Sequence, residues 1–318
     1  MKSFAKRGVN VTKLTRQEWL TERQKGIGGS DAAAVIGVSP WKSAAQVYMD
    51  KVEPIAEEDE AKVSERLRIG HDLEDYVAKR FMEETGKKVR RCNYMLHHPE
   101  HEFLLADIDR EIVGENAILE CKTTNSYAAG EWVDEPPEHY QMQCLHYMMV
   151  TGVDRVYIAA LIGNERFVWF ALDRDEEAIA ALMQAEIAFW RDNVEARVCP
   201  PPDGSNAYSE YLKERYPQDD GGQMTLSPDG EGALVGYLAM MESRKKLDES
   251  IELYRQQIEA EMGEAQIAHT LSGHKVTWKT QSRTTIDAKR LKKELPGVYD
   301  TFAKQSTSRV FRVSEMRG

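Results

Sequence analysis

Two stretches that read as neighbouring strands constrain the fold of this chain most. Residues 102–113 read EFLLADIDREIV and residues 117–124 read AILECKTT, and Gly114, Glu115 and Asn116 stand between them. A short turn of Gly and Asn between two apolar runs is typical of an antiparallel hairpin. We therefore expect a sheet at the centre of the fold.

The patterns on either side of this hairpin predict helices that cover the sheet. Leu73, Val77 and Phe81 recur every four residues and predict a helix over 64–85 that ends at Gly86. A further helix is expected at 14–23, where Thr15 and Glu18 form a capping box, and another begins after Ser30 and Asp31. Other helices are expected at 39–52, entered through Pro40, at 134–152 and at 173–198. Further strands are expected at 155–163 and 165–172. This order favours an α/β (α+β) core, with a central mixed sheet flanked by helices.

Composition divides the chain into three parts. Residues 1–200 hold the elements above, and residues 201–230 are polar and rich in Pro, Gly and Asp, as expected of a linker. A C-terminal extension, residues 231–318, follows. Its elements are a long helix over 231–262 with a coiled-coil-like stripe at Leu247, Ile251, Tyr254 and Ile258, and a small α+β element in which strands at 274–280 and 306–313 pair around a basic helix.

The net charge of −11 argues against a protein that coats nucleic acid in general. The charge is uneven, because residues 269–318 contain eleven Lys and Arg against four Asp and Glu, or +7, which leaves −18 for the rest. Local basic patches or bridging Mg²⁺ would still allow DNA binding. The chain has no apolar run of about 18 residues and no signal-peptide core near its start, so a cytoplasmic protein without a membrane span is expected.

The four cysteines argue against a zinc or iron–sulfur site. Cys92, Cys121, Cys144 and Cys199 are scattered and form no CxxC pair. Reduced and mostly buried thiols are therefore expected.

Acidic and basic residues on the hairpin suggest hydrolytic chemistry. Alternation along a strand puts Glu120 and Lys122 on one face and Cys121 on the other, and Asp107 and Asp109 share a face of the preceding strand. If the strands pair, carboxylates for a hard cation and an ammonium group meet at one place, as Mg²⁺-dependent phosphodiester hydrolysis requires. The alternative is an ordinary strand with a charged outer face.

Glu74 and the pair of Arg23 and Ser30 also allow two interpretations each. Glu74 lies on the predicted helix between Gly70 and Ala78, whose small side chains leave room for a carboxylate to reach inward. Arg23 and Ser30 put a guanidinium and a hydroxyl beside a glycine-rich helix start, which suits an anion. The alternatives are a surface acid and a simply capped helix.

Four motifs in sequence order resemble the YqaJ-type viral recombinase family, which is lambda-exonuclease-like and belongs to the PD-(D/E)XK nuclease superfamily. They read GIGGSDAAAVIGVSPW (26–41), GHDLE (70–74), ADID with LECKTT (106–124) and QMQCLHYMMVTG (141–152), and the similarity covers about residues 15–200. The resemblance implies a restriction-endonuclease-like core. It also implies a Mg²⁺-dependent 5′→3′ exonuclease, with Mn²⁺ as a substitute, that digests linear double-stranded DNA and leaves 3′ single-stranded tails.

The resemblance also implies roles for individual residues. Asp109, Glu120 and the main-chain carbonyl of Cys121 would hold the metal, and Lys122 would assist the attacking water. Glu74 would bind the metal or its water, and Gln143 and Tyr147 match a helix motif beside the site, with packing as the alternative for Tyr147. Arg23 and Ser30 would grip the 5′-phosphate. Asp107 departs from the pattern, because the lambda enzyme has a phosphate-binding serine there, and the choice between Asp107 and Asp109 as metal ligand stays open.

Expected partners follow from the same resemblance. They are double-stranded DNA ends, a single-strand annealing protein and further copies of the chain. These copies would form a ring, with a trimer favoured over a tetramer. The expected location is the cytoplasm of a bacterial cell that carries the phage or prophage gene. The alternatives are a catalytically silent DNA-end-binding scaffold and, disfavoured by cysteine spacing, an iron–sulfur nuclease.

The C-terminal extension could pack on its own core, on a neighbouring subunit or on the annealing protein. Two interpretations are open for its basic residues, which either touch DNA or form a solvated basic face. These residues are Lys289, Arg290, Lys292, Lys293, Arg309 and Arg312.

Overall fold

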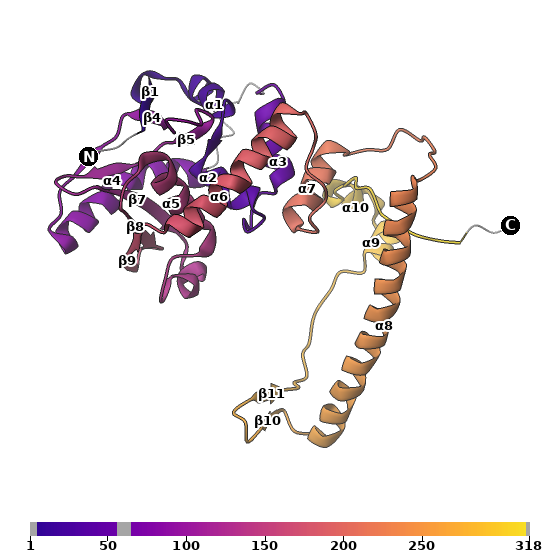
Figure 1. The fold of residues 1–318 in the computed structure, drawn as a ribbon. Coiled ribbons are helices and arrows are strands. Elements are labelled where there is room, and N and C mark those ends of the chain that lie inside the picture. The colour runs from indigo at the N-terminus through magenta and orange to yellow at the C-terminus, as the bar shows by residue number, and fades with distance from the viewer. Residues whose placement is uncertain (1–4, 56–64, 316–318) are drawn as a thin grey trace. The chain divides into compact units, whose positions relative to one another are not determined.

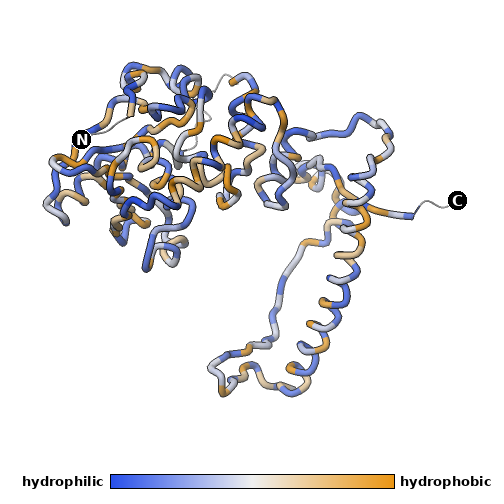
Figure 2. Tube along the Cα trace, viewed as in Figure 1, coloured by the Kyte–Doolittle hydropathy of each residue, from blue (hydrophilic) through white to orange (hydrophobic). Residues whose placement is uncertain are grey.

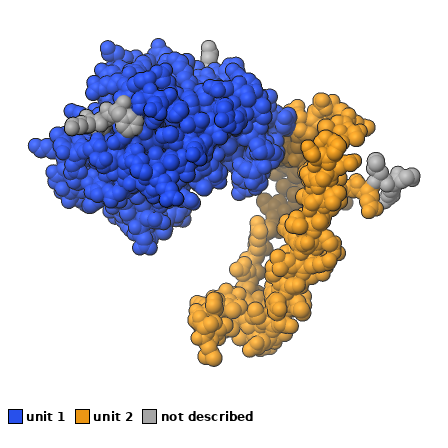
Figure 3. Space-filling model, in the orientation of Figure 1, with its two compact units in different colours: residues 1–216 blue, residues 217–318 orange. Residues whose placement is uncertain are grey.

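The structure is a computed structural model that describes residues 5–55 and 65–315. The chain forms two compact units, Met1–Tyr216 and Pro217–Gly318, which Figure 3 shows in different colours. No helix in the described part of the chain is long and apolar enough to cross a membrane.

The first unit contains two sheets (Figure 1). The larger has the order β3-β6-β7-β8-β9, in which β7 and β8 are parallel and the other neighbours antiparallel. Its strands are β3 (Val89–Arg91), β6 (Arg110–Ile112), β7 (Ala117–Thr124), β8 (Arg155–Ile162) and β9 (Arg166–Asp173). The smaller sheet has the order β1-β4-β5-β2, with β5 and β2 parallel. Its strands are β1 (Lys6–Asn10), β2 (Ile27–Gly28), β4 (Tyr94–His97) and β5 (Leu104–Ala106).

Helices cover both faces of the larger sheet. α4 (Glu65–Thr85) packs on the face that carries Leu119, and α5 (Glu138–Thr151) on the face that carries Ile118. The other elements of this unit are α1 (Arg16–Gln24), α2 (Gly29–Val35), α3 (Ala44–Val52), α6 (Glu176–Phe189), a π-helix η4 (Trp190–Glu195), α7 (Asn206–Arg215) and the 3-10 helices η1 (Val11–Lys13) and η3 (Ser126–Trp132). Odd-numbered residues at the start of β7 therefore face α4, and even-numbered residues face α5.

The mixed α/β fold with helix-covered sheets confirms the expected fold class, and most elements lie where the sequence predicts them. The capping box of Thr15 and Glu18 at the start of α1 is present. The helix expected over 64–85 is α4, which the structure describes from Glu65, so Ser64 lies outside the described residues. The expected entry of α3 through Pro40 is wrong, because the Ser43 side chain accepts a hydrogen bond from the backbone N–H of Gln46 and caps the helix there.

The expected single strand over 102–113 is also wrong. The chain divides there into β5, which belongs to the smaller sheet, and β6, which pairs with β7 in the larger one. The division falls at Asp107 and Asp109, whose carboxylates accept hydrogen bonds from Trp19 and from the backbone of Cys121, respectively. The hairpin is therefore shorter than predicted, although its turn is correctly placed.

The second unit is built on α8 (Pro228–Met262), close to the long helix that the sequence predicts. It also contains β10 (Ile267–His269), β11 (Lys275–Thr277), α9 (Ala288–Glu294) and α10 (Pro296–Phe302). The expected pairing of 274–280 with 306–313 is wrong, because β11 pairs with β10 and 306–313 forms no strand. A tight turn closes the observed hairpin, whereas the predicted pairing would have to close a much longer loop.

The three-part division at residues 200 and 230 stays a prediction. The contacts within the chain place the boundary between the two units after Tyr216. Helix α7 lies inside the stretch that composition marks as a linker, and it packs against α3 of the first unit.

Candidate active site

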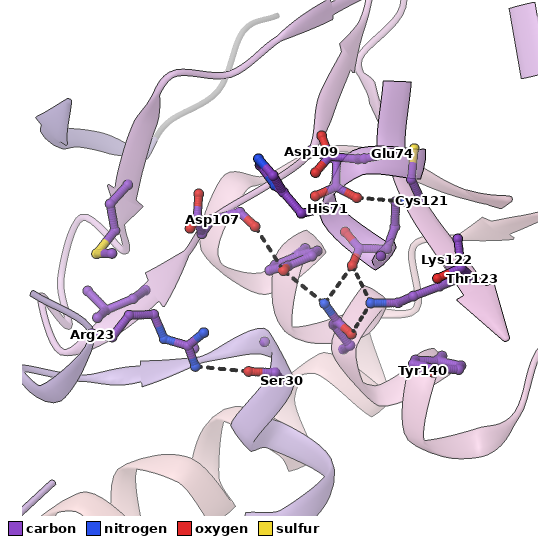
Figure 4. A pocket seen from close by; sticks show the side chains of 18 of the residues that line it. Arg23, Ser30, His71, Glu74, Asp107, Asp109, Cys121, Lys122, Thr123 and Tyr140 are labelled. Atoms are coloured by element: carbon purple, nitrogen blue, oxygen red, sulfur yellow. Dashed lines mark hydrogen bonds and ion pairs between the residues drawn. The ribbon is translucent and has the colours of Figure 1, made fainter. Parts of the chain in front are cut away.

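A cleft of about 660 Å³ opens in the first unit between β7, α5 and the segment after β5 (Figure 4). All ten residues that the sequence marks as site candidates line this cleft: Arg23, Ser30, Glu74, Asp107, Asp109, Glu120, Cys121, Lys122, Gln143 and Tyr147. They come from α1, α2, α4, β7, α5 and the link between β5 and β6. The fold thus gathers residues that lie more than a hundred positions apart in the sequence.

Glu120 is the centre of a buried polar network. The side chain lies on the face of β7 toward α5, and the residue is 3% exposed. Its Oε1 accepts hydrogen bonds from Lys122 Nζ at 2.6 Å and from Gln143 Nε2 at 2.7 Å, and Lys122 also donates to Gln143 Oε1 at 2.9 Å. Its Oε2 is buried and has no hydrogen-bond partner in the described structure. One carboxylate oxygen is therefore left to receive a ligand from the cleft.

Lys122 is held as a cation at the edge of this network. Burial opposes the charge, but the carboxylates of Glu120 and Asp109 outweigh burial and keep the pKa of the Lys122 ammonium above its usual value. The ammonium also lies 4.9 Å from the centre of the Tyr140 ring, in a cation–π contact. Lys122 is thus a charged hydrogen-bond donor and not a proton acceptor at neutral pH.

Asp109 reaches the same strand from the link before β6. Its Oδ2 accepts a hydrogen bond of 2.7 Å from the backbone N–H of Cys121. Burial raises the pKa of the Asp109 carboxyl well above its usual range, and repulsion from Glu120 and Glu74 adds to the shift. Burial also raises the pKa of Glu120. Two carboxylates held close together in a buried site favour a cation between them.

Glu74 has a different partner from the one that the sequence suggests. Its carboxylate forms a short ion pair with Arg110, which also binds Asp75 at 2.7 Å and donates to the main-chain oxygen of Asp109 at 2.7 Å. The Arg110 side chain is buried. In this arrangement Glu74 neutralises Arg110 at the rim of the site.

Asp107 and Asp109 point to different partners. Asp107 Oδ2 accepts a hydrogen bond of 2.9 Å from Trp19 Nε1, on α1. The main-chain oxygen of Asp107 accepts from the hydroxyl of Tyr147, which in turn accepts from Gln143. Burial raises the pKa of the Asp107 carboxyl, although the bond from Trp19 opposes this. The contacts therefore place Asp109 beside β7 and Asp107 beside α1.

Arg23 and Ser30 meet beside the same cleft. Arg23 Nη2 donates to Ser30 Oγ at 2.9 Å and to Asp31 Oδ2 at 3.2 Å. Asp31 is 2% exposed and also pairs with Lys42 at 3.1 Å and Lys51 at 2.8 Å. Asp31 orients the guanidinium of Arg23 through the hydrogen bond between them, and Lys42 also pairs with Asp50 at 2.5 Å.

A buried pair steadies the end of β5. His146 and Glu186 are fully buried and lie 2.9 Å apart, on α5 and α6 respectively. The other ring nitrogen of His146 lies 2.8 Å from the main-chain oxygen of Leu105. Burial opposes protonation of His146, but Glu186 outweighs it and raises the pKa of the imidazole. This contact fixes the strand just before Asp107.

Gly29 gives a prediction about the packing of the site. A Cβ at this position would lie 2.6 Å from the Tyr147 ring, so the helix start and the tyrosine could not both keep their places. We expect Gly29→Ala to lower the free energy of unfolding by about 1–3 kcal/mol. Urea unfolding followed by circular dichroism measures this. The matched control is Gly130→Ala, where a Cβ would meet nothing within 4 Å, and equal stability of the two variants would contradict the packing.

The donor set suits a small divalent cation with few protein ligands. Within residues 5–55 and 65–315, no group of three or more His, Cys, Asp or Glu side chains is placed to hold a metal ion. Asp109 and Glu120 are two carboxylates, and the unpartnered Oε2 of Glu120 is the observation that supports a ligand between them. Mg²⁺ is usually held by one or two carboxylates and keeps several waters. The residues present therefore fit Mg²⁺, with Glu74 committed to Arg110.

The cysteines are free thiols, as expected, but only one of the four is buried, where most were expected to be. Cys144 is buried and Cys199 exposed, and Cys121 packs with Leu119 on the face of β7 opposite Glu120. Burial, and then the negative charges of Asp109 and Glu120, raise the pKa of the Cys121 thiol well above its usual value. This thiol is thus a packing group.

Several contacts of the site were not predicted from the sequence. Arg110, Tyr140, Trp19 and Asp31 each touch one of the candidate residues. A usable signal existed for Arg110, because it is a charged residue that follows Asp109 directly at the start of a strand. No pattern of spacing indicates Tyr140 or Trp19, which reach the site only through the fold.

A buried carboxylate bound to a lysine on a mixed sheet, beside an open cleft, is the centre of the candidate site. Residues 18–154 match the model of the YqaJ-like viral recombinase domain. The chain is 40% identical over 311 residues to the protein YqaJ of Bacillus subtilis (strain 168), with 96% of each chain covered. The chain belongs to the family of YqaJ-like viral recombinase domains, as the resemblance of its motifs predicted.

Solved structures give a weaker likeness. The alkaline exonuclease LHK-Exo from Laribacter hongkongensis matches with a TM-score of 0.49 and 20% identity, over 63% of this chain and 97% of that one. A phage-related exonuclease from Haemophilus somnus 129PT matches with a TM-score of 0.40 and 14% identity, over 60% of this chain and 96% of that one.

Proposed function

We propose that this protein is a divalent-metal-dependent exonuclease that digests linear double-stranded DNA from its 5′ ends and leaves 3′ single-stranded tails for recombination by strand annealing. The observation that carries the proposal is the pair of carboxylates formed by the buried Glu120 and the half-buried Asp109, with the cationic Lys122 bound to Glu120 in an open cleft. Membership of a viral recombinase family supports it.

Each residue of the centre has a distinct proposed task. Asp109 and Glu120 would hold Mg²⁺, or Mn²⁺ in its place, together with the main-chain carbonyl of Cys121. The bound cation would polarise the scissile phosphate and lower the pKa of water. Lys122, which is held charged, would orient that water and stabilise the negative charge that develops on the phosphate. Gln143 would keep Glu120 and Lys122 in register.

The surroundings would complete the site. Glu74, which pairs with Arg110 at the rim of the cleft, would bind the metal or hydrogen-bond its water. Tyr147 would link Gln143 to the main chain at Asp107. Because Asp107 is turned toward Trp19, we assign it to positioning and not to metal binding.

Arg23 and Ser30 would receive the 5′-terminal phosphate. A guanidinium and a hydroxyl that already share a hydrogen bond present donors to one point. Lys42 and Lys51 lie behind them, where both pair with Asp31 and Lys42 also pairs with Asp50. The carboxylate of Asp107 stays away from this point through its bond to Trp19.

We expect Arg23→Ala to reduce digestion of 5′-phosphorylated duplex roughly tenfold more than digestion of the same duplex with 5′-hydroxyl ends, because a charge-assisted bond to the phosphate is lost. Initial rates on the two substrates measure the difference. Arg191→Ala, at an exposed arginine paired only with its neighbour Asp192 among the contacts described, is the control. Equal loss on both substrates would contradict the phosphate pocket.

The test of the whole proposal is digestion of a linear duplex labelled separately at its 5′ and 3′ ends, with Mg²⁺, with Mn²⁺ and with EDTA. We expect early release of the 5′ label and retention of the 3′ label in the two metals, and no release in EDTA. End binding without digestion in any metal would reject the nuclease and favour the catalytically silent scaffold.

The proposed partners follow from the proposed product. Tails of single-stranded DNA would pass to a single-strand annealing protein. A ring of subunits around the duplex, a trimer in preference to a tetramer, would keep a chain with a net charge of −11 on DNA by enclosure more than by attraction.

A further inference from the structure

Helix α8 presents an apolar stripe to solvent. Leu247, Ile251, Tyr254 and Ile258 follow one another at spacings of four, three and four residues, and they are 60%, 56%, 66% and 45% exposed. Figure 2 shows the mixture of apolar and polar residues along this helix. Spacing of this kind is the seam of a two-helix coiled coil, and side chains of this size gain most when a second helix covers them.

The rest of the helix surface in this region is polar, apart from Leu253 and Ala260. The exposed polar positions include Lys245, Lys246, Glu249, Glu252 and Gln256, and Glu259 is half-buried. A helix that is apolar on a narrow stripe and charged elsewhere suits one partner helix and not burial on all sides.

Charged residues continue the stripe at both ends. Arg244 precedes Leu247 by three residues, and Glu261 follows Ile258 by three, so each occupies the next seam position. In a parallel pair of two copies in register, each seam position faces itself. Arg244 would then face Arg244 and Glu261 would face Glu261, which costs energy at both ends.

We propose that α8 pairs with α8 of a second copy of this chain, with the two helices antiparallel. In this register Leu247 faces Ile258 of the second copy, and Ile251 faces Tyr254. Arg244 faces Glu261, so opposite charges flank the four apolar layers at both ends. Every layer occurs twice about the two-fold axis, as a closed dimer requires.

The residues that flank the seam agree with this register. Asp248 lies on the same edge as Arg255, and antiparallel pairing brings Asp248 of one copy beside Arg255 of the other. In the single chain, Asp248 lies 3.6 Å from Arg244, and Arg255 lies 3.2 Å from Glu252 and 2.9 Å from the half-buried Glu259. Such surface pairs are weak and exchange readily for pairs between helices. The charge pattern of this helix is thus complementary to itself, which selects a second copy as the occupant.

Sedimentation of the full chain tests the pairing. We expect Leu247→Glu with Ile251→Glu to halve the mass of the assembly and to weaken association at least about a hundredfold, because four charges then enter the seam. Leu253→Glu is the matched control, since Leu253 is an exposed apolar residue of the same helix (54%) that lies off the stripe, and its mass should equal that of the wild type. These substitutions lie at exposed positions, so circular dichroism should show an unchanged fold.

Charge exchange tests the direction. Arg244→Glu or Glu261→Arg alone should each weaken association about tenfold by placing like charges together, and the double variant should restore it. If the Leu247→Glu, Ile251→Glu variant has the same mass as the wild type, the pairing of two α8 helices is wrong. This holds even if the variant no longer binds an annealing protein. A double variant that fails to restore association overturns the antiparallel register. The masses do not depend on nuclease activity, so failure of the proposed function leaves this test intact.

Discussion

Replacing Lys122 with alanine is expected to slow the digestion of linear duplex DNA by about 10²–10³-fold. The side chain is held as a cation by Glu120 and Asp109, and it is the positive group closest to Glu120. Its loss removes the charge that would stabilise the phosphate as negative charge develops. Initial rates at saturating DNA and Mg²⁺, under single-turnover conditions, measure the chemical step directly.

The control for this variant is Lys79→Ala. Lys79 lies on α4, is 70% exposed at its side chain and makes a weak ion pair of 3.8 Å with Glu83. Its removal should change the digestion rate by less than about twofold. If Lys122→Ala digests DNA at the wild-type rate while its fold is unchanged, Lys122 has no role in the reaction and the assignment of the centre is wrong.

The centre could be predicted because it depends on the alternation of a single strand. Glu120 and Lys122 project from one face of β7 and Cys121 from the other, as a period of two requires. The position of Asp109 opposite this strand follows from the turn at Gly114. These relations are local, so the sequence contains them.

The same reasoning failed where the outcome depends on distant partners. Alternation puts Asp107 and Asp109 on one face, but Trp19 draws one carboxylate to α1 and Cys121 holds the other. The role of Glu74 at the metal stays a prediction, and its carboxylate pairs with Arg110, a contact that spacing did not indicate. In the second unit, β11 was predicted to pair with residues 306–313, but it pairs with the nearby strand β10. Each of these outcomes is decided by a contact with another segment that spacing along one segment does not reveal.

Asp109→Asn should have two effects of opposite sign. Activity should fall by at least about 10³-fold, because the cation loses a charged ligand and with it several kcal/mol of stabilisation of the transition state. The metal-free protein, however, should become more stable at neutral pH, with a melting temperature higher by about 2–5 °C. Asparagine keeps an oxygen for the backbone N–H of Cys121 and removes a half-buried negative charge beside Glu120.

The way stability depends on pH shows why metal-free Asp109→Asn should be more stable than the wild type. In the unfolded chain the Asp109 carboxyl ionises near its usual pKa of about 4, whereas burial raises its pKa in the folded protein. The folded wild type therefore holds this proton more tightly and loses stability as the pH rises from the unfolded pKa to the folded one. The advantage of Asp109→Asn in EDTA should grow over that window and then level off.

Addition of Mg²⁺ should reverse the order of the two proteins. The cation binds the folded wild type and stabilises it by mass action, whereas the variant lacks the charge that would retain the cation. Melting temperatures of both proteins in EDTA and in Mg²⁺, with Asp134→Asn at an exposed position as the control, separate a functional carboxylate from a structural one. A carboxylate kept for packing would lower stability when it is replaced, in EDTA and Mg²⁺ alike. A gain in stability in EDTA that disappears in Mg²⁺ instead indicates a functional site. The negative charges of such a site destabilise the metal-free fold, and the bound ion offsets this effect.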